Sequence, residues 1–492
     1  MSEPTATGGP RPRPRQIPRF GIALVVAGTL VGVGLIDHAL TPPSSPAAAA
    51  PVVAQAAPVG AESSSWYCVG GTGPSGGSPP IVDLVNSSSV PVSGTVTAIG
   101  DPAASASSPV TVPAHGQVSV SPAQLVGSTQ FVAADVDLEG GGVVASESVA
   151  GPTGWAQTPC ASNAATSWYF AAGDTSTAYD FLSLYNPDST PAVVDLTFVI
   201  GSKVTSPTPF QGLIVPPGRL VVAGVDSYVQ EEPQVATVAT ARSGRVVAAQ
   251  LLQYDDNGLT GLSVATGTPV AAPRWSFPRS NDVSGGSTMF EVFNPGTASA
   301  HVTVRLRLPS GPVAPLRQVV PPASTWTLDA SSLTRLPANT DYAASFSTAG
   351  GPGVVVWRLA SAPAASVAPQ WGAVPGVAEG PPATSYVLPA AGTPALPATT
   401  GAAPVGLGLL NSGTAPAVVS IDVYGAHGPT PLAGSPVHLD AGAFTVIQGS
   451  SLPPTDALLV TCHEEGVSVM EDFVPAGMAG LVAQPGVALT PP

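Results

Sequence analysis

Apolar and polar positions alternate in four short segments of the chain, and each segment ends on an asparagine. The residues two and four positions before each asparagine are apolar, and the residue between them is Asp, Ser, Glu or Gly. This two-residue period is typical of a β-strand with one buried face. The asparagines are Asn86, Asn186, Asn294 and Asn411, at intervals of 100, 108 and 117 residues. The spacing predicts four copies of one structural repeat.

A second alternating segment follows each asparagine after a short turn. In the second copy the turn reads PDSTP, and the segment that follows carries Leu196 and Phe198 at its apolar positions. Asparagine favours such turns because its side chain hydrogen-bonds the backbone that follows it. We therefore expect the four asparagines to be structural turn residues that begin a β-hairpin in every copy.

Each copy also opens with an aromatic residue, carries a Pro/Gly-rich turn in its middle and closes with a late hairpin. The opening residues are Trp66, Trp168, Trp275 and Tyr386. About six or seven short strands per ~100 residues is typical of an immunoglobulin-like sandwich. The sequence therefore predicts an all-β fold of tandem immunoglobulin-like β-sandwich repeats. The alternative is a closed barrel or propeller-like assembly whose repeats are not independent.

The first 65 residues differ from the repeats in composition. Residues 1–19 are basic and Pro-rich, and Phe20–Ile36 is an uncharged apolar run. As a helix this run spans about 25 Å, the short end of what crosses a bilayer. No Ala-x-Ala pattern follows it directly, which favours a retained transmembrane signal-anchor over a cleaved signal peptide. Residues 37–65, rich in Pro and Ala, are expected to form a disordered linker.

These features predict the organisation of the chain and its place in the cell. The basic tail is expected in the cytoplasm and the repeats outside it, because the cytoplasmic flank of a membrane segment is usually the one richer in Lys and Arg. We therefore expect a single-pass protein of the plasma membrane that contacts the membrane through its N-terminal helix. The predicted repeats are residues 66–163, 164–272, 273–383 and 384–492.

Charge excludes one class of partner. The chain carries 15 Lys and Arg against 30 Asp and Glu, a net charge of −15, and Lys203 is its single lysine. A nucleic acid backbone needs a surface rich in Lys and Arg, so no nucleic acid partner is expected. The acids are dispersed along the sequence, which favours a solvated surface over an acidic binding patch.

The chain has three cysteines, and two of them bracket the first repeat. Cys68 follows the opening aromatics and Cys160 lies just before the second repeat. The positions that correspond to Cys68 in the other copies are apolar, which indicates an inward-facing site. We predict a Cys68–Cys160 disulfide, as is common outside the cytoplasm. Cys462, in the apolar run LLVTC, is predicted to be a free, buried thiol.

The sequence offers no catalytic set, and no cofactor or metal is expected. The familiar hydrolase, zinc-protease and nucleotide-binding motifs are absent from it. His115, in the turn PAHG, is interpreted as a surface residue. The stretches 255–258 and 463–466 are interpreted as hairpin turns rather than a calcium loop or a metal site. The tryptophans without a repeat partner are better candidates for an exposed glycan platform than the opening ones, which are expected in the core; they are Trp155, Trp326, Trp357 and Trp371.

The opening WYCVGGT of Trp66–Thr72, together with the repeated strand-plus-Asn pattern, resembles a family of uncharacterised actinobacterial envelope proteins. The resemblance implies one N-terminal membrane segment, a secreted β-rich region and a setting near cell-wall glycan assembly, but no functional residues. The leading hypothesis is a non-enzymatic, anchored cell-envelope protein that presents an extracytoplasmic surface to a protein or glycan. The alternative is an enzyme or enzyme accessory in cell-wall polysaccharide assembly.

Overall fold

The computed structural model describes residues 54–490 except 153, 257–258, 282–285, 363–369, 379–382, 391–401, 426–427 and 476–481. These residues belong to a compact unit, Ala50–Pro492. The predicted anchor Phe20–Ile36 lies outside the described residues. Within the described part of the chain, no helix has the length and apolar character needed to cross a bilayer.

The prediction of an all-β protein is confirmed, because strands make up nearly all of the regular structure. In the first repeat two antiparallel four-stranded sheets, ordered β2-β7-β4-β5 and β6-β3-β8-β9, enclose one core. Apolar residues at alternate positions, such as Val82 and Leu84 of β3 and Val136 and Leu138 of β7, fill this core together with Trp66, as the two-residue period requires. The elements are β2 (Ser64–Thr72), η1 (Pro74–Gly76), β3 (Pro80–Asn86), β4 (Val92–Asp101), β5 (Ala104–Val112), β6 (Gln117–Val120), α2 (Ala123–Val126), β7 (Phe131–Leu138), β8 (Val143–Gly151) and β9 (Gly154–Pro159).

The second repeat has the same pair of sheets. One has the order β10-β16-β12-β13 with β14 also paired to β12, and the other contains β15-β11-β17-β18. The elements are β10 (Ser167–Phe170), β11 (Ala178–Tyr185), β12 (Ala192–Ile200), β13 (Lys203–Thr205), η2 (Thr208–Phe210), β14 (Leu213–Val215), β15 (Leu220–Gly224), β16 (Ala236–Ser243), β17 (Val247–Asp256) and β18 (Leu259–Thr266).

The third repeat has one sheet ordered β22-β21-β25-β19-β28, with β23 paired to β21, and a second group of strands ordered β27-β26-β20-β24. The elements are β19 (Arg274–Asn281), β20 (Ser287–Asn294), β21 (Ala300–Leu308), β22 (Gly311–Pro312), β23 (Leu316–Val320), β24 (Ser324–Asp329), β25 (Asp341–Thr348), β26 (Val355–Ala362), β27 (Gln370–Pro375) and β28 (Val377–Ala378).

The fourth repeat has one sheet ordered β38-β29-β35-β31-β32, with β33 paired to β31, and a second sheet ordered β34-β30-β36-β37. The elements are β29 (Ser385–Leu388), β30 (Ala402–Asn411), β31 (Ala417–Gly425), β32 (Gly428–Pro431), β33 (Val437–Leu439), β34 (Phe444–Gln448), η3 (Gly449–Ser451), β35 (Leu458–Cys462), β36 (Val467–Pro475), β37 (Val482–Pro485) and β38 (Val487–Leu489).

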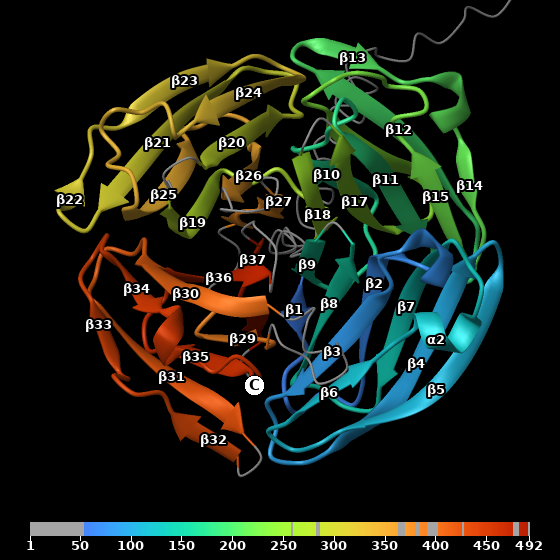
Figure 1. The fold of residues 1–492 in the computed structure, drawn as a ribbon, viewed down its shortest axis with the longest axis horizontal. Coiled ribbons are helices and arrows are strands. Elements are labelled where there is room, and N and C mark those ends of the chain that lie inside the picture. The colour runs from blue at the N-terminus through green and yellow to red at the C-terminus, as the bar shows by residue number, and fades with distance from the viewer. Residues whose placement is uncertain are drawn as a thin grey trace, which may run out of the picture. The chain divides into compact units, whose positions relative to one another are not determined.

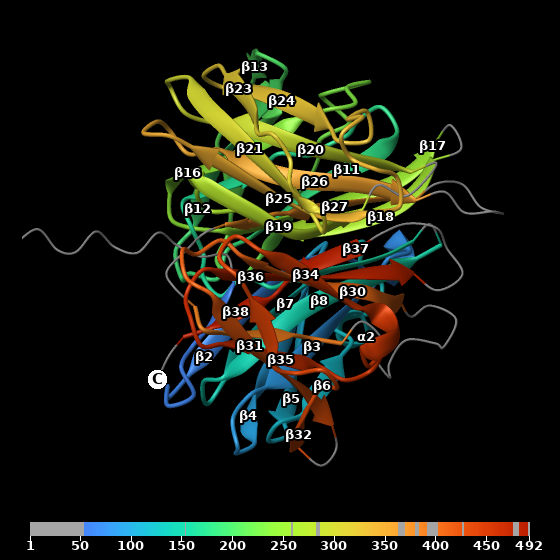
Figure 2. The ribbon, with the colours of Figure 1, turned by 90° about the vertical axis from the view of Figure 1, so that its left-hand side faces the viewer.

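The four repeats are not independent of one another. Strand β18 of repeat 2 pairs in parallel with β27 of repeat 3, so the two repeats share an eight-stranded sheet. The closing strands β9, β18, β27 and β37 lie near the common centre around which the repeats are arranged (Figure 1). Strand β1 (Gln55–Ala56), which precedes repeat 1, pairs in parallel with β38 at the end of repeat 4. The first and last described strands therefore join the two ends of the series. Figure 2 shows the molecule from the side, with β19 and β27 of repeat 3 above β36 and β37 of repeat 4.

Each opening aromatic ties its own two sheets together. The indole N–H groups of Trp66, Trp168 and Trp275 donate to carbonyl oxygens at or just before the start of the second strand of the late hairpin, at 3.1, 2.7 and 2.6 Å. The Tyr386 hydroxyl makes the equivalent bond in repeat 4, to Val467 at 2.9 Å. A buried aromatic with a polar end satisfies a backbone group while filling the core.

The unpaired tryptophans are less exposed than we expected. Trp155 and Trp357 are completely buried, and Trp326 is half-buried. Trp155 packs edge-on against Phe473 of repeat 4, with ring centroids 5.8 Å apart. The expectation of exposure was wrong for the first two because they fill contacts between repeats, which a comparison of repeat positions does not reveal.

Candidate functional site

The four predicted turn asparagines occupy one geometry. In repeat 3, the Asn294 amide donates to the Ala298 carbonyl at 2.9 Å and to the Val320 carbonyl at 3.0 Å, and its oxygen accepts from Gly296 N–H at 3.0 Å. The other three make the same set of bonds, and all four are completely buried. Each links its own turn to the backbone of the strand 26 to 29 residues later, so these residues are structural.

The predicted disulfide is confirmed. Cys68 and Cys160 are bonded, with their Cα atoms 4.7 Å apart and 92 residues between them in sequence. Cys462 is a free thiol and is buried. Burial, and secondarily the charge of Glu464, raises the pKa of this thiol to about 12, so it is protonated and unreactive at neutral pH.

Repeats 3 and 4 are joined by a buried ionic cluster. Asp472 accepts hydrogen bonds of 2.6 Å from both Arg279 and Arg358, and Arg279 also pairs with Asp341 at 2.9 Å. Gly408 lies directly against Arg279, since a Cβ added to it would come within 2.6 Å of the arginine Cβ. The charges of this cluster are paired with one another, which makes it a structural link between the two repeats.

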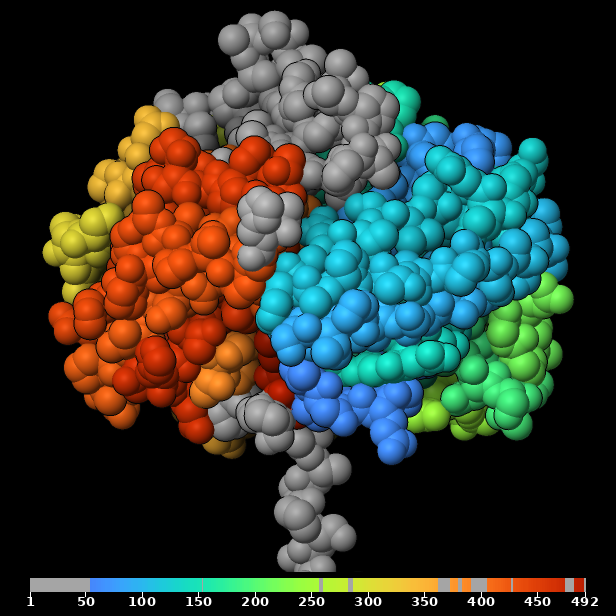
Figure 3. All heavy atoms as spheres, turned by 90° about the horizontal axis from the view of Figure 1, so that it is seen from below, coloured from blue at the N-terminus to red at the C-terminus, as the bar shows by residue number. Residues whose placement is uncertain are grey.

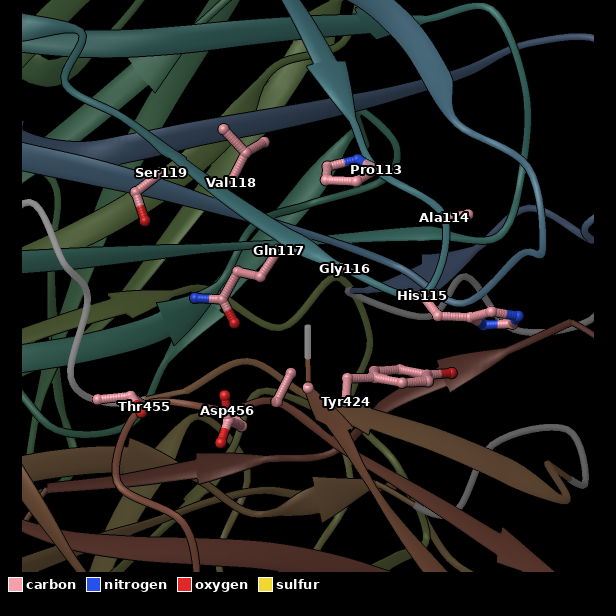
Figure 4. Close-up of a pocket in the computed structure, with 12 residues that line it drawn as sticks. Pro113, Ala114, His115, Gly116, Gln117, Val118, Ser119, Tyr424, Thr455 and Asp456 are labelled. Carbon is pink, nitrogen blue, oxygen red and sulfur yellow. The ribbon is translucent and has the colours of Figure 1, made fainter. Parts of the chain in front are cut away.

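A cavity of about 680 Å³ lies where repeat 1 meets repeat 4, and it is the strongest candidate for a binding site. Figure 3 shows the two repeats side by side on one face of the molecule. One side of the cavity is the turn and strand Pro113–Ser119, and the other is formed by Tyr424–Gly425 and Thr455–Ala457 (Figure 4). We call this place the seam site. Its volume falls within the range of about 300–1,000 Å³ typical of small-ligand sites.

An aromatic pair forms one end of the seam site. The rings of His115 and Tyr424 stack at a centroid distance of 5.9 Å and an interplanar angle of 29°. His115 has a φ of 48°, a left-handed conformation that is unfavourable for a residue with a Cβ. The equivalent positions of repeats 2 and 4 are Gly218 and Gly442, also with positive φ. The repeat fold therefore requires this conformation, and repeat 1 meets it with an imidazole.

Polar atoms in the seam site have unused hydrogen-bonding capacity. The His115 Nδ1, Gln117 Nε2 and Tyr424 hydroxyl are buried and have no hydrogen-bond partner among the described residues. Burial, with a smaller contribution from the charge of Asp422, raises the pKa of Tyr424 to about 12, so its hydroxyl keeps its proton. Buried polar groups are nearly always paired, and unpaired ones require an explanation.

Behind the seam site, a buried carboxyl group orients a hydroxyl. Ser119 donates to Asp83 at 2.5 Å, and Asp83 is completely buried. Burial raises the pKa of Asp83 to about 7, although the bonds from Ser119 and Ser148 act in the opposite direction. With its proton directed at Asp83, the Ser119 oxygen offers lone pairs to the cavity.

Across the described ranges, no three His, Cys, Asp or Glu side chains come close enough together to hold a metal ion. The polar turn 463–466 is exposed or half-buried, and Glu464 in it accepts a hydrogen bond from Val418 N–H at 2.7 Å. Strands β17 and β18 pair on either side of residues 257–258, as expected of the predicted hairpin.

Sequence analysis missed the seam site and placed His115 at the surface, whereas it is half-buried. A weak signal was present. Gln117 and Ser119 occupy strand positions where repeat 2 has Leu220 and Val222, so polar residues replace apolar ones. That substitution becomes informative only once repeat 4 is known to lie opposite.

Comparisons with known proteins give little about function. Three solved structures are similar to parts of the chain: a Thermotoga maritima protein titled 1070 (19% identity, 22% of this chain and 96% of that chain, TM-score 0.20), the Anabaena sensory rhodopsin transducer (22%, 18% and 96%, 0.16), and a tetra-tandem repeat from the extending region of a large adhesion protein (14%, 82% and 93%, 0.11). TM-scores this low carry no argument. No curated protein matches the chain. Residues 147–348 match the model of a family of unknown function, DUF5719.

Proposed function

We propose that this protein is a non-enzymatic, membrane-anchored cell-envelope protein whose immunoglobulin-like repeats present a binding surface outside the cytoplasm, with the seam site as its binding site. The observation that carries the proposal is the set of buried nitrogen and oxygen atoms without hydrogen-bond partners in the seam site, at the junction of two repeats. Strand β1 pairs with β38 close to this junction in the fold, and Thr490 N–H and hydroxyl both donate to the Ala56 carbonyl. Groups held on a rigid framework bind with less entropic cost.

The proposed location is supported by two features. The buried disulfide in repeat 1 is of the kind that persists in oxidising compartments. The basic tail and the apolar run Phe20–Ile36 have the composition of a signal-anchor with a cytoplasmic N-terminus. Protease treatment of intact cells tests this location. Loss of the repeats with protection of the N-terminal tail is expected, and full protection of the repeats would contradict it.

The binding function is tested with the full-length protein in mild detergent. We expect it to co-sediment with purified, insoluble envelope material in a saturable way and to leave that material chemically unchanged. Release of soluble sugars or peptides from the envelope material during incubation would overturn the non-enzymatic proposal and favour an enzyme of cell-wall assembly. Absence of saturable co-sedimentation would overturn the proposed binding function.

A further inference from the structure

We infer that the seam site binds a neutral oligosaccharide. This inference rests on the proposed binding function and specifies the chemical class of its ligand. It is carried by three observations: the kinds of groups that line the cavity, the absence of cationic groups among them, and the way repeat 1 departs from the other repeats at this place.

The lining groups match the surface of a sugar. Sugars present hydroxyl groups that donate and accept together, and C–H faces that pack on flat rings. The seam site offers an amide donor in Gln117, an acceptor in Ser119 and an aromatic ring in Tyr424, with further hydroxyl and carboxylate groups in Thr455 and Asp456. Figure 4 shows Gln117 and Ser119 on one side of the cavity and Thr455, Asp456 and Tyr424 on the other. A ligand in between can therefore be held from both repeats.

Charge selects against acidic ligands. Among the described lining residues there is one carboxylate, Asp456, and neither Lys nor Arg. The whole chain carries a net charge of −15, which repels anions at long range. A phosphate or uronate group loses bound water when it enters a site, and Lys or Arg side chains normally compensate for that loss. The described lining residues of the seam site include neither. An apolar ligand is equally disfavoured, because it would leave the Gln117 amide without a partner.

Repeat 1 departs from the common fold where this ligand would sit. Glycine is the residue suited to the left-handed turn position, and repeats 2 and 4 have Gly218 and Gly442 there. His115 occupies this position with strain, and its ring lies over Tyr424 of another repeat. Repeat 3 has Ala323 at this position with a φ of 45°, so the strain is shared, and what distinguishes repeat 1 is an imidazole that stacks on an aromatic ring of another repeat.

The comparison with repeat 3 indicates what the site lacks. Glu291 and Thr327 hold the positions of Asp83 and Ser119, and Thr327 donates to Glu291 at 2.8 Å. In repeat 3 this pair also receives a side-chain amide, from Gln234 of repeat 2. Beside the Ser119–Asp83 pair of repeat 1 the structure has a cavity. The geometry therefore points to an external polar ligand at this junction.

Calorimetric titration of the full-length protein in mild detergent tests the inference. The probes are neutral tri- and tetrasaccharides of glucose, mannose, galactose, arabinose or N-acetylglucosamine, with trigalacturonic acid as the charged control. We expect at least one neutral probe to bind saturably and the acidic control not to bind. Gln117→Leu and Tyr424→Phe each remove one hydrogen-bonding group and are expected to weaken binding about threefold to tenfold.

His115→Gly separates binding from folding. It relieves the strained backbone conformation, so the melting temperature is expected to stay the same or rise while saccharide affinity falls. Ala323→Gly is the matched control, since Ala323 has a φ of 45° at the same position of repeat 3. It is expected to affect stability in the same direction and to leave affinity unchanged.

Three outcomes would overturn the inference. They are the absence of any saccharide binding, binding that the seam variants do not alter, and preference for the acidic probe or for a peptide. If the wild type still co-sediments with envelope material in any of these cases, the proposed function stands and only the ligand class assigned to the seam site is wrong.

Discussion

Arg279 of repeat 3 and Asp472 of repeat 4 form an ion pair of 2.6 Å, and their side chains are 5% and 0% exposed. Asp472 also accepts a hydrogen bond from Arg358, which is 1% exposed. Two carboxylates, Asp472 of repeat 4 and Asp341 of repeat 3, thus balance the two guanidinium groups. Removing one charge of such a buried cluster leaves the others incompletely compensated, so the junction depends on both signs of charge.

Removing this carboxylate is expected to loosen the junction of repeats 3 and 4. Asp472→Ala leaves the buried Arg358 without its carboxylate partner and Arg279 with Asp341 alone, so the free energy of unfolding should fall by about 3–5 kcal/mol. Urea denaturation at pH 7 measures the change. Arg245→Ala, which breaks the exposed pair with Asp188, is the control and should cost less than about 1 kcal/mol. Equal effects of the two substitutions would contradict the structural role of Asp472.

The buried asparagines are expected to be among the most sensitive polar positions. Asn294→Ala leaves three carbonyl oxygens and one N–H without their side-chain partner. We expect it to lower the free energy of unfolding by about 2–4 kcal/mol. Asn294→Asp should be worse near neutral pH, since a carboxylate faces those carbonyl oxygens and cannot donate to them. The exposed Asn163→Ala serves as the control, and a comparable loss there would refute the interpretation.

Stability should depend on pH in an unusual direction. Burial raises the pKa of several carboxyl groups, to about 7 for Glu147 and Glu291 and about 8 for Asp180 and Glu471. In the unfolded chain these groups titrate near pH 4. Their protonated forms therefore favour the folded state, and this stability is complete below pH 4 and lost as the pH rises through 7–8. Melting curves should give a higher midpoint at pH 5 than at pH 8.5.

Asp180 is the group with which to test this pH dependence. Its carboxyl accepts from Gln250 Nε2 at 2.9 and 3.0 Å, while Gln250 Oε1 is buried without a hydrogen-bond partner in the structure. Asp180→Asn is neutral at every pH and can donate to that oxygen. It should raise the midpoint at pH 8.5 and reduce the difference between pH 5 and pH 8.5. Glu465→Gln, in an exposed turn, should leave that difference unchanged.

The disulfide is expected to stabilise repeat 1 mainly by restricting the unfolded chain. For a loop of 92 residues the chain-entropy model gives about 4–5 kcal/mol. The Cys68→Ala/Cys160→Ala double variant should lose roughly this amount in denaturant unfolding. Dithiothreitol should destabilise the wild type and have no effect on the double variant. A reductant effect that persists in the double variant would show that another thiol is responsible.

Local patterns in the sequence were sufficient for much of the fold. Alternation around Asn186 and Asn411 predicted paired strands, and the structure has β11 and β30 ending at or beside these residues. The pairing of Cys68 with Cys160 followed from their places at the two ends of one repeat. These features depend on residues that are neighbours in the chain or lie in the same repeat. The local sequence is therefore enough to predict the strands and the cysteine pair.

Contacts between repeats could not be predicted in this way. Trp155 and Trp357 were expected at the surface and are buried, and nothing in their local sequence distinguishes the two environments. Arg279 and Asp472 are separated by 193 residues, and each looks like an ordinary surface charge when considered alone. Side chains from different repeats meet only once the shared sheet and the β1–β38 pair have set the arrangement.

The sequence by itself therefore determined the all-β class, the strands that end at the repeated asparagines and the disulfide, because short-range periodicity and turn chemistry act within each copy. Only the tertiary structure decided that the repeats are interlocked, that acids such as Glu147, Asp180 and Glu471 lie buried, and that His115 and Tyr424 meet at one cavity. The physical reason is that burial and juxtaposition depend on which faces of the sandwiches pack together. Those contacts join residues that are far apart in the sequence, such as His115 and Tyr424. An amphipathic pattern shows which face of a strand is buried, but not which distant residue packs against it.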